Sequence, residues 1–100
     1  MSDTVEVRIT HNAAASRFEV PVDGHLCVAA YDRDDGVLRM IHTEVPRALE
    51  GRGIAAALVR AALSHARTHG LRIAPVCSYV RVYMKRHPET HVLLADGYTV

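Results

Sequence analysis

Residues 50–70 read EGRGIAAALVRAALSHARTHG, and this stretch decides how the rest of the chain is interpreted. It begins with two glycines on either side of an arginine and continues with apolar residues at the three- and four-residue spacing of an amphipathic helix. Gly70 supplies a helix stop, because glycine readily adopts the left-handed conformation that follows a last helical turn. The stretch therefore predicts a glycine-lined loop that opens a helix from Ile54 to about His69.

The residues before this helix have the two-residue alternation of half-buried strands. Asp23-Gly24 and Asp35-Gly36 each stand between apolar runs, and Asp-Gly pairs suit the positive φ angles of tight hairpin turns. Four strands are predicted from these signals, over residues 5–9, 17–22, 26–32 and 37–45. Together they predict an antiparallel meander.

One more strand and one more helix are predicted after residue 70. LRIAPV, residues 71–76, is a short apolar segment, and residues 78–86 return to helical spacing until Pro88 ends it. A strand, a helix and a strand in this order make the two strands parallel. The predicted fold class is α/β (α+β): an antiparallel meander, a strand–helix–strand unit and a final helix, in one domain of residues 1–100.

The charges are balanced overall but unevenly distributed. The formal net charge is +1, yet none of the 11 acidic residues lies between Gly51 and Pro88. That segment carries seven basic residues: Arg52, Arg60, Arg67, Arg72, Arg81, Lys85 and Arg86. Because amides at a helix start and nearby cations both attract anions, the segment favours an anionic ligand. A solvated basic face is the alternative, which we expect at least for Arg60 and Arg67.

The two cysteines, Cys27 and Cys77, both lie among apolar residues. In a chain long enough to form its own core, this number does not indicate a disulfide framework, so we expect a reducing compartment. Apolar runs such as residues 54–59 are too short to span a bilayer, and the first ten residues lack the pattern of a signal peptide. We therefore expect a cytoplasmic protein with no membrane partner.

The loop GRGIAA, residues 51–56, formally matches the Gly-x-Gly-x-x-Gly/Ala fingerprint of dinucleotide-binding proteins. That fingerprint also needs an acidic residue about 20 positions on, whereas the next strand ends in Val76-Cys77-Ser78. A P-loop would need Gly-Lys-Ser/Thr, which does not follow these glycines. What remains is a phosphate-bearing ligand held by backbone amides at the start of a helix.

The same loop resembles that of the GNAT superfamily of acetyl-CoA-dependent N-acetyltransferases, whose phosphate loop reads Gln/Arg-x-x-Gly-x-Gly/Ala. Residues 50–55 match its core, while Ala48 replaces the leading Gln/Arg and Arg47 stands one residue early. HTEVPRALEGRGIA, APVCSYV and RHPE are further similar to the compact YjdJ-type N-acetyltransferase-like subfamily, over most of residues 17–89. After the last helix, THVLLADGYTV replaces the further hairpin that family members commonly have.

The resemblance implies acetyl-CoA as co-substrate, with its pantetheine arm in a cleft between the strand that ends at Val45 and the strand of residues 71–76. The pyrophosphate would accept hydrogen bonds from the amides of residues 52–55. His65 and His69 stand four apart but lack a third ligand, so we expect no metal. The cofactor-binding residues expected on this basis are Val45, Gly51, Arg52, Gly53, Ile54, Ala55, Arg86 and His87.

Acetyl transfer to an amine needs a base for the amine and an acid for the leaving thiolate. By resemblance Tyr83 is the acid, and Tyr79 lies one turn earlier on the same helix face; a packing role is the alternative for both. His42 and Glu44 share one strand face and are candidate bases. The alternative is that they simply form an exposed polar face of the strand. Cys77 is either a nucleophile at a helix start or a small hydrophobic residue.

The preferred function is therefore an N-acetyltransferase that moves acetyl from acetyl-CoA to a primary amine, by direct attack. Its acceptor would be a small molecule or a protein lysine, and a second copy of the chain could complete the cleft. A catalytically silent CoA-binding module is the first alternative. A small nucleic-acid-binding domain is the second, with only Tyr79 and Tyr83 available for stacking in the basic segment.

Overall fold

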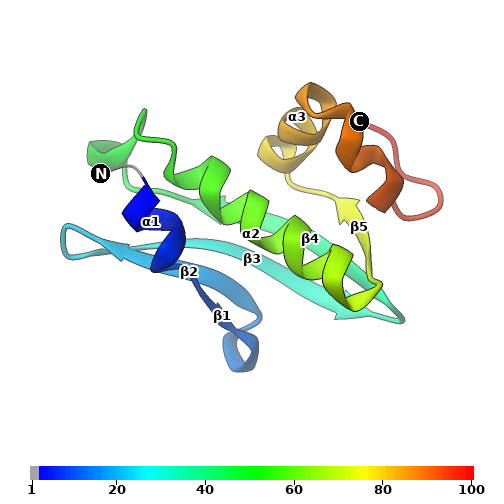
Figure 1. Ribbon diagram of the computed structural model, residues 1–100, viewed down its shortest axis with the longest axis horizontal. Coiled ribbons are helices and arrows are strands. Elements are labelled where there is room, and N and C mark those ends of the chain that lie inside the picture. Colours follow the sequence, from blue (N-terminus) through cyan, green and yellow to red (C-terminus); the bar gives the residue numbers. More distant parts are fainter. Residues whose placement is uncertain (1–2) are drawn as a thin grey trace.

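A five-stranded sheet forms the base of the structure, a computed structural model that describes residues 3–100 (Figure 1). Its strands follow one another across the sheet in chain order: β1 (Thr10–Asn12), β2 (Arg17–Val22), β3 (His25–Asp34), β4 (Val37–Glu44) and β5 (Arg72–Pro75). Strands β1 to β4 are antiparallel, whereas β4 and β5 are parallel. The predicted meander and strand–helix–strand unit are confirmed.

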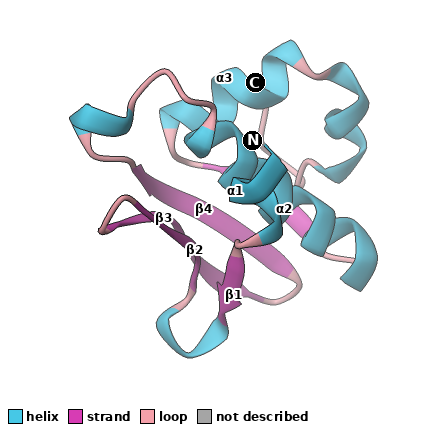
Figure 2. Ribbon diagram, turned by 60° about the vertical axis from the view of Figure 1, so that its left-hand side comes forward, coloured by secondary structure: helices cyan, strands magenta, loops and turns pink. Residues whose placement is uncertain are grey.

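The helical elements within residues 3–100 are α1 (Asp3–Val7), α2 (Ile54–His69), α3 (Ser78–Arg86) and 3-10 segments at Ala13–Ala15, Arg47–Leu49 and Pro88–Leu93. Helices α2 and α3 have the bounds predicted from the sequence. Helices α1 and α2 lie on the same side of the meander (Figures 1 and 2). Across the described part of the chain, no helix has both the length and the apolar character needed to cross a membrane.

Both predicted hairpin turns are present. Asp23 and Gly24 have φ angles of 50° and 79°, and Asp35 and Gly36 have φ angles of 50° and 81°. Two successive positive φ angles match the right-handed twist of the flanking strands, which explains why Asp-Gly stands at each turn.

The core lies between α2 and the inner face of the sheet. Alternate residues of β2, β3 and β4 face inward and are buried: Phe18, Val20, Val22, Cys27, Ala29, Tyr31, Leu38 and Met40. Helix α2 covers them with Leu58, Val59, Ala62, Leu63 and Ala66. Cys27 is fully buried in this cluster, as expected for a packing residue, and burial raises the pKa of its thiol.

The N-terminal segment differs from the prediction, because residues 5–7 belong to helix α1 and the first strand begins only at Thr10. Val5 and Ile9, four residues apart, pack against the core, whereas Val7 is 81% exposed. The Glu6 carboxylate also pairs with Arg60 of α2. Contact with α2 therefore favours a short helix that turns Val5 inward, with Ile9 inward just after it, over the alternating face that suggested a strand.

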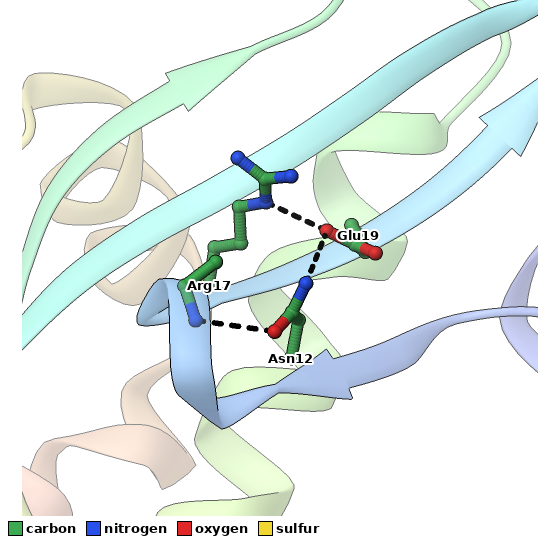
Figure 3. Close-up of polar contacts among 4 residues, drawn as sticks. Asn12, Arg17 and Glu19 are labelled. Atoms are coloured by element: carbon green, nitrogen blue, oxygen red, sulfur yellow. Dashed lines mark hydrogen bonds and ion pairs between the residues drawn. The ribbon is translucent and has the colours of Figure 1, made fainter.

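A polar network joins β1 to β2 (Figure 3). Asn12 accepts a hydrogen bond from the Ala15 amide at 3.1 Å and donates one to Glu19 at 3.3 Å. Arg17 Nε lies 2.6 Å from the same Glu19 carboxylate and lowers its pKa. The side chain of Asn12 thus caps the 3-10 segment while it connects the two strands.

A β-bulge interrupts the pairing of β3 with β4. Ala30 pairs with His42 and Tyr31 with Met40, so Ile41 is an extra residue on β4. One extra residue reverses which side chains face the core. Leu38 and Met40 face inward before the bulge, and odd-numbered residues do so after it.

Three histidines from β1 and α2 gather at the C-terminal end of α2. The His11 ring of β1 lies 4.4 Å from that of His65, which stacks on His69 at 4.1 Å. His11 Nε2 also hydrogen-bonds the Tyr31 hydroxyl at 2.5 Å. Burial lowers the pKa values of His11 and His65, and the neighbouring His69 and Arg33 lower them further.

This cluster predicts that stability falls with acidification. A histidine with a lowered pKa binds protons less readily when the protein is folded than when it is unfolded. Its contribution to the free energy of unfolding is therefore complete above about pH 6.5. It decreases as the pH falls toward the folded-state pKa values of His11 and His65. The free energy of unfolding, measured by urea denaturation from about pH 8 to about pH 5, should decrease over this interval.

The matched variants are His65→Phe, which keeps an aromatic ring in the cluster but cannot be protonated, and His25→Phe at the exposed start of β3. His65→Phe should show a shallower pH dependence than the parent, and His25→Phe should follow the parent. If His65→Phe lost stability as steeply as the parent, the cluster would not be the source of the effect.

Candidate active site

Strands β4 and β5 part from each other at one end of the sheet. β5 pairs with β4 only from Val37 to Met40, and the last bond between them runs from the Cys77 amide to the Met40 carbonyl at 2.8 Å. Beyond this bond β4 continues to Glu44. Figure 1 shows the short β5 beside the longer β4. The predicted splay between these strands is therefore present.

A pocket of about 430 Å³ occupies this opening. Its walls come from the end of β4, from the loop before α2, from the first turn of α2 and from α3. The lining residues are Thr43, Val45, Leu49, Glu50, Gly51, Gly53, Ile54, Ala55, Ala56 and Tyr79. Five of the residues expected to bind the cofactor thus line one pocket: Val45, Gly51, Gly53, Ile54 and Ala55.

The start of α2 opens into this pocket with free backbone donors. Gly51 and Gly53 have φ angles of 82° and 78°, which L-residues rarely adopt. The first helical hydrogen bond runs from Ala57 to Gly53 at 3.0 Å. No side chain of residues 3–100 caps this end, and its first turn carries no acidic residue. The Ile54 and Ala55 amides are therefore available to an anion, which the helix dipole also favours.

The bulge at Ile41 decides which β4 side chains reach the pocket. Thr43 and Val45 line it, whereas His42 and Glu44 lie on the opposite face, with side chains 61% and 67% exposed. Their side chains contact each other at 3.4 Å between Nε2 and Oε1. The two candidate bases therefore share one face, as expected, but do not line the pocket.

Cys77 lies directly behind the pocket wall. Its Sγ is 3.6 Å from the Oγ1 of Thr43, and its side chain is half-buried against the core. It precedes the first residue of α3. The structure thus brings Cys77 to the point where β4 and β5 part. Cys77 contacts Thr43, and Thr43 lines the pocket.

The two tyrosines of α3 occupy different positions. Tyr79 lines the main pocket, and burial raises the pKa of its phenol, with a smaller contribution from Tyr83. Tyr83 stacks on His87 at 4.1 Å between ring centroids. A second hollow of about 200 Å³ lies beyond Tyr79, lined by Ala56, Arg60, Tyr79, Val82, Tyr83, Arg86 and His87. Both hollows share Ala56 and Tyr79, so they are neighbours.

Four arginines of the acid-free segment contact other groups of the fold. Arg52 pairs with Asp23 of the β2–β3 turn at 2.8 Å and lowers the pKa of that carboxyl, and Arg60 pairs with Glu6. Arg72 and Arg81 donate to backbone carbonyls. The Arg52 side chain is thus directed to a hairpin, whereas the role expected for Arg52 concerned its backbone amide.

No three His, Cys, Asp or Glu side chains within residues 3–100 come together in an arrangement that could hold a metal. His69 Nδ1 instead lies 2.9 Å from the His65 carbonyl oxygen, near the C-terminus of α2.

Several residues of the site could not be found from the sequence. Thr43 faces the pocket only because of the bulge, which has no clear local signal. Leu49 is 3% exposed, and its burial fixes the 3-10 turn that leads into the loop. Glu50 and Ala56 belong to the loop motifs matched in the sequence, but neither was expected to bind the ligand.

Comparisons with known proteins agree with this geometry. The family model described as GCN5-related N-acetyl-transferase matches residues 17–93. Protein NATD1 of Mus musculus is 33% identical over 85 residues, which cover 82% of this chain and 77% of the relative. Protein NATD1 of Xenopus tropicalis is 31% identical over 91 residues, which cover 88% and 84%.

The fold is also similar to that of a solved protein. The solution structure of a GCN5-like protein from Staphylococcus aureus aligns with a TM-score of 0.72 at 22% identity, over 90% of this chain and 89% of that one. The finer resemblance to the YjdJ-type subfamily stays a prediction. The family model, however, spans the sheet from β2 onward, the glycine loop and α3, and the chain belongs to the GCN5-related N-acetyltransferase family.

Proposed function

We propose that this acetyltransferase binds acetyl-CoA in the groove between β4, α2 and α3 and transfers its acetyl group to a primary amine. The observation that carries the proposal is the uncapped, glycine-lined start of α2, which opens into a pocket at the parting of β4 and β5. A backbone anion site at the edge of a pocket suits a ligand with phosphates at one end and an apolar arm at the other.

The parts of CoA can be assigned to parts of the groove. The amides of Arg52, Gly53, Ile54 and Ala55 would bind the pyrophosphate. The pantetheine arm would follow Val45 and Thr43 at the end of β4. Arg86 and His87, in the second hollow, would lie beside the nucleotide end.

The proposed chemistry is direct attack by the amine on the thioester carbon. A carbon–nitrogen bond forms, the carbon–sulfur bond breaks, and the sulfur leaves as a thiolate that needs a proton. We assign this proton to Tyr79, because its phenol lines the pocket and a tyrosine phenol is protonated at neutral pH. Tyr83, the family's usual position, lies in the second hollow.

The proton of the attacking amine would pass through water. His42 and Glu44 form the nearest pair of candidate acceptors on β4, and their exposed face leaves them in contact with solvent. Because both side chains turn away from the pocket, a bridging water is required for either to act as the base.

Two alternative functions make different predictions. A catalytically silent CoA-binding module would bind acetyl-CoA and never release free CoA with any amine. A nucleic-acid-binding domain would use the basic segment, but four of its arginines already contact side chains or carbonyls of the fold. A screen of small amines and lysine peptides, with detection of free CoA thiol, tests the proposal against the first alternative.

The glycine loop gives the first test, which is thermal unfolding with CoA. A hundredfold excess over the dissociation constant should stabilise the fold by about 2.7 kcal/mol, or about ten degrees or more in Tm. Gly53→Ala should lose most of this shift, because its methyl group and strained φ would disturb the amides that face the pocket.

Gly70→Ala is the matched control. Gly70 also has a positive φ, 67°, and an added Cβ meets no atom within 4 Å at either glycine, but Gly70 ends the same helix far from the pocket. Both variants should lose similar stability, and only Gly53→Ala should lose the CoA shift. A full shift in Gly53→Ala, or a shift with oligonucleotides but not with CoA, would contradict the proposal.

The acid is tested by comparing Tyr79→Phe with Tyr83→Phe in the presence of an accepted amine. Loss of the Tyr79 hydroxyl should lower kcat by about a hundredfold while the Kd for CoA changes little, because general acid catalysis contributes on this order. Tyr83→Phe should lose much less in kcat. The opposite result would return the role to Tyr83.

The Cys77 thiol separates direct attack from a covalent route. Its hydrogen-bond partner is the Thr43 hydroxyl, which is too weak a base to activate it. We therefore expect Cys77→Ala to change the rate without abolishing turnover. Intact-mass spectrometry after incubation with acetyl-CoA alone provides the check. An acetyl adduct that transfers to amine, together with complete loss of turnover in Cys77→Ala, would establish the covalent route instead.

A further inference from the structure

The Arg52 side chain stands between two partners. Its neighbours Gly51 and Gly53 both line the main pocket, so its backbone lies at the uncapped start of α2. Its guanidinium donates instead to Asp23 of the β2–β3 turn, with Nη1 2.8 Å from Oδ2. The guanidinium lowers the pKa of the Asp23 carboxyl, as a close opposite charge does. Arg52 is therefore bound to an anion that the chain itself supplies.

This arrangement leaves the pocket without a cation of its own. No basic side chain is among the described residues that line it, and the charged residue in that lining is Glu50, an exposed carboxylate. Ala48 stands where the GNAT pattern has Gln or Arg, and residues 48–59 contain a single basic residue, Arg52. Backbone amides bind phosphate, but a nearby cation strengthens such a site and a nearby carboxylate weakens it. Within the loop, Arg52 is the side chain that can supply this cation.

The contact between Asp23 and Arg52 can open at small cost. Their side chains are 65% and 50% exposed, so water replaces the lost contact and no buried charge is left behind. An added Cβ at Gly51 or Gly53 would meet no atom within 4 Å, so the surroundings of Arg52 are open. A guanidinium donates to phosphate oxygens in the same paired geometry as to a carboxylate. A phosphate at the loop amides would therefore compete with Asp23 for the same donor.

We propose that Arg52 exchanges the Asp23 carboxylate for the pyrophosphate of CoA, and that Asp23 thereby sets how tightly the loop binds the ligand. This inference rests on the proposed function and deepens it, because it names the side chain that joins the backbone amides and the carboxylate that opposes it. Asp23 is a positioning residue, since it holds Arg52 in the free protein and does not touch the ligand. Each CoA molecule that recruits Arg52 must first displace this carboxylate.

Asp23→Asn tests the exchange, because it removes the competing charge and keeps the turn: Asn-Gly suits the same positive φ angles as Asp-Gly. The Kd for CoA, measured by isothermal titration calorimetry at low ionic strength, should fall about three- to fivefold, as expected when an exposed ion pair no longer has to be broken. The unfolding temperature without ligand should not rise. A merely structural role for Asp23 would not tighten binding.

Asp35→Asn is the matched control for the turn. Asp35-Gly36 has nearly the same φ angles as Asp23-Gly24 but lies at the other end of β3, away from the loop. The substitution removes the same charge from the same kind of turn. It should leave the Kd for CoA unchanged.

A second background separates exchange from the general effect of removing a negative charge near an anion site. Arg52→Gln should raise the Kd for CoA about fivefold, and adding Asp23→Asn to it should give no further change, because no guanidinium remains to be released. Glu50→Gln provides the contrast. Its carboxylate lines the pocket and has no contact with Arg52 to release, so its removal should tighten binding by a similar factor in the parent and in Arg52→Gln.

The outcomes distinguish this inference from the proposed function. If CoA does not bind the parent, the proposed function fails. If CoA binds the parent but Asp23→Asn fails to tighten binding, or tightens it equally in the Arg52→Gln background, the exchange is wrong while CoA binding stands. Arg52→Gln with the parent's Kd, or Asp35→Asn with the effect of Asp23→Asn, would overturn the inference in the same way.

Discussion

The early end of β5 is the constraint on which the candidate active site depends. Pro75 is the last residue of β5, and by the alternation of the strand the next amide that would donate to β4 belongs to Val76. The Val76 amide instead bonds the Ala74 carbonyl at 2.9 Å, which turns the chain away. β4 continues to Glu44 without this neighbour, and Thr43 of this unpaired end lines the pocket. The turn at Val76 thus separates a paired part of the sheet from an open one.

Local chemistry explains why much of the fold could be predicted. The Asp-Gly pairs set both hairpins, Gly70 takes the left-handed conformation after α2, and Pro88 stands just after α3. Each of these signals acts within a few residues of its own position. The segment of residues 5–9 shows the limit of such signals, because its alternating pattern is equally compatible with a helical pair once α2 offers a surface. Tertiary contact with α2 decided between a strand and a helix in this segment.

The side chains that face the pocket were harder to predict, because the bulge at Ile41 depends on the pairing of two strands. Simple alternation correctly placed His42 and Glu44 on one face but could not say which face the pocket would occupy. The extra residue turns Thr43 and Val45 toward the ligand space and leaves an ionisable pair outside it. A small hydroxyl residue and a valine are compatible with a narrow apolar arm, whereas two charged groups there would each need to be desolvated.

The loop before α2 also shows how a departure from the family pattern can be tolerated. Ala48 stands where the GNAT pattern has Gln or Arg, and the Arg52 side chain reaches Asp23 instead of the pocket. An exposed ion pair of this kind contributes little to stability, so it cannot by itself hold the loop in place. The burial of Leu49 and the positive φ angles of Gly51 and Gly53 are the stronger constraints. Because these features position backbone amides, an anion site of this type depends on chain conformation more than on the side chains of the loop.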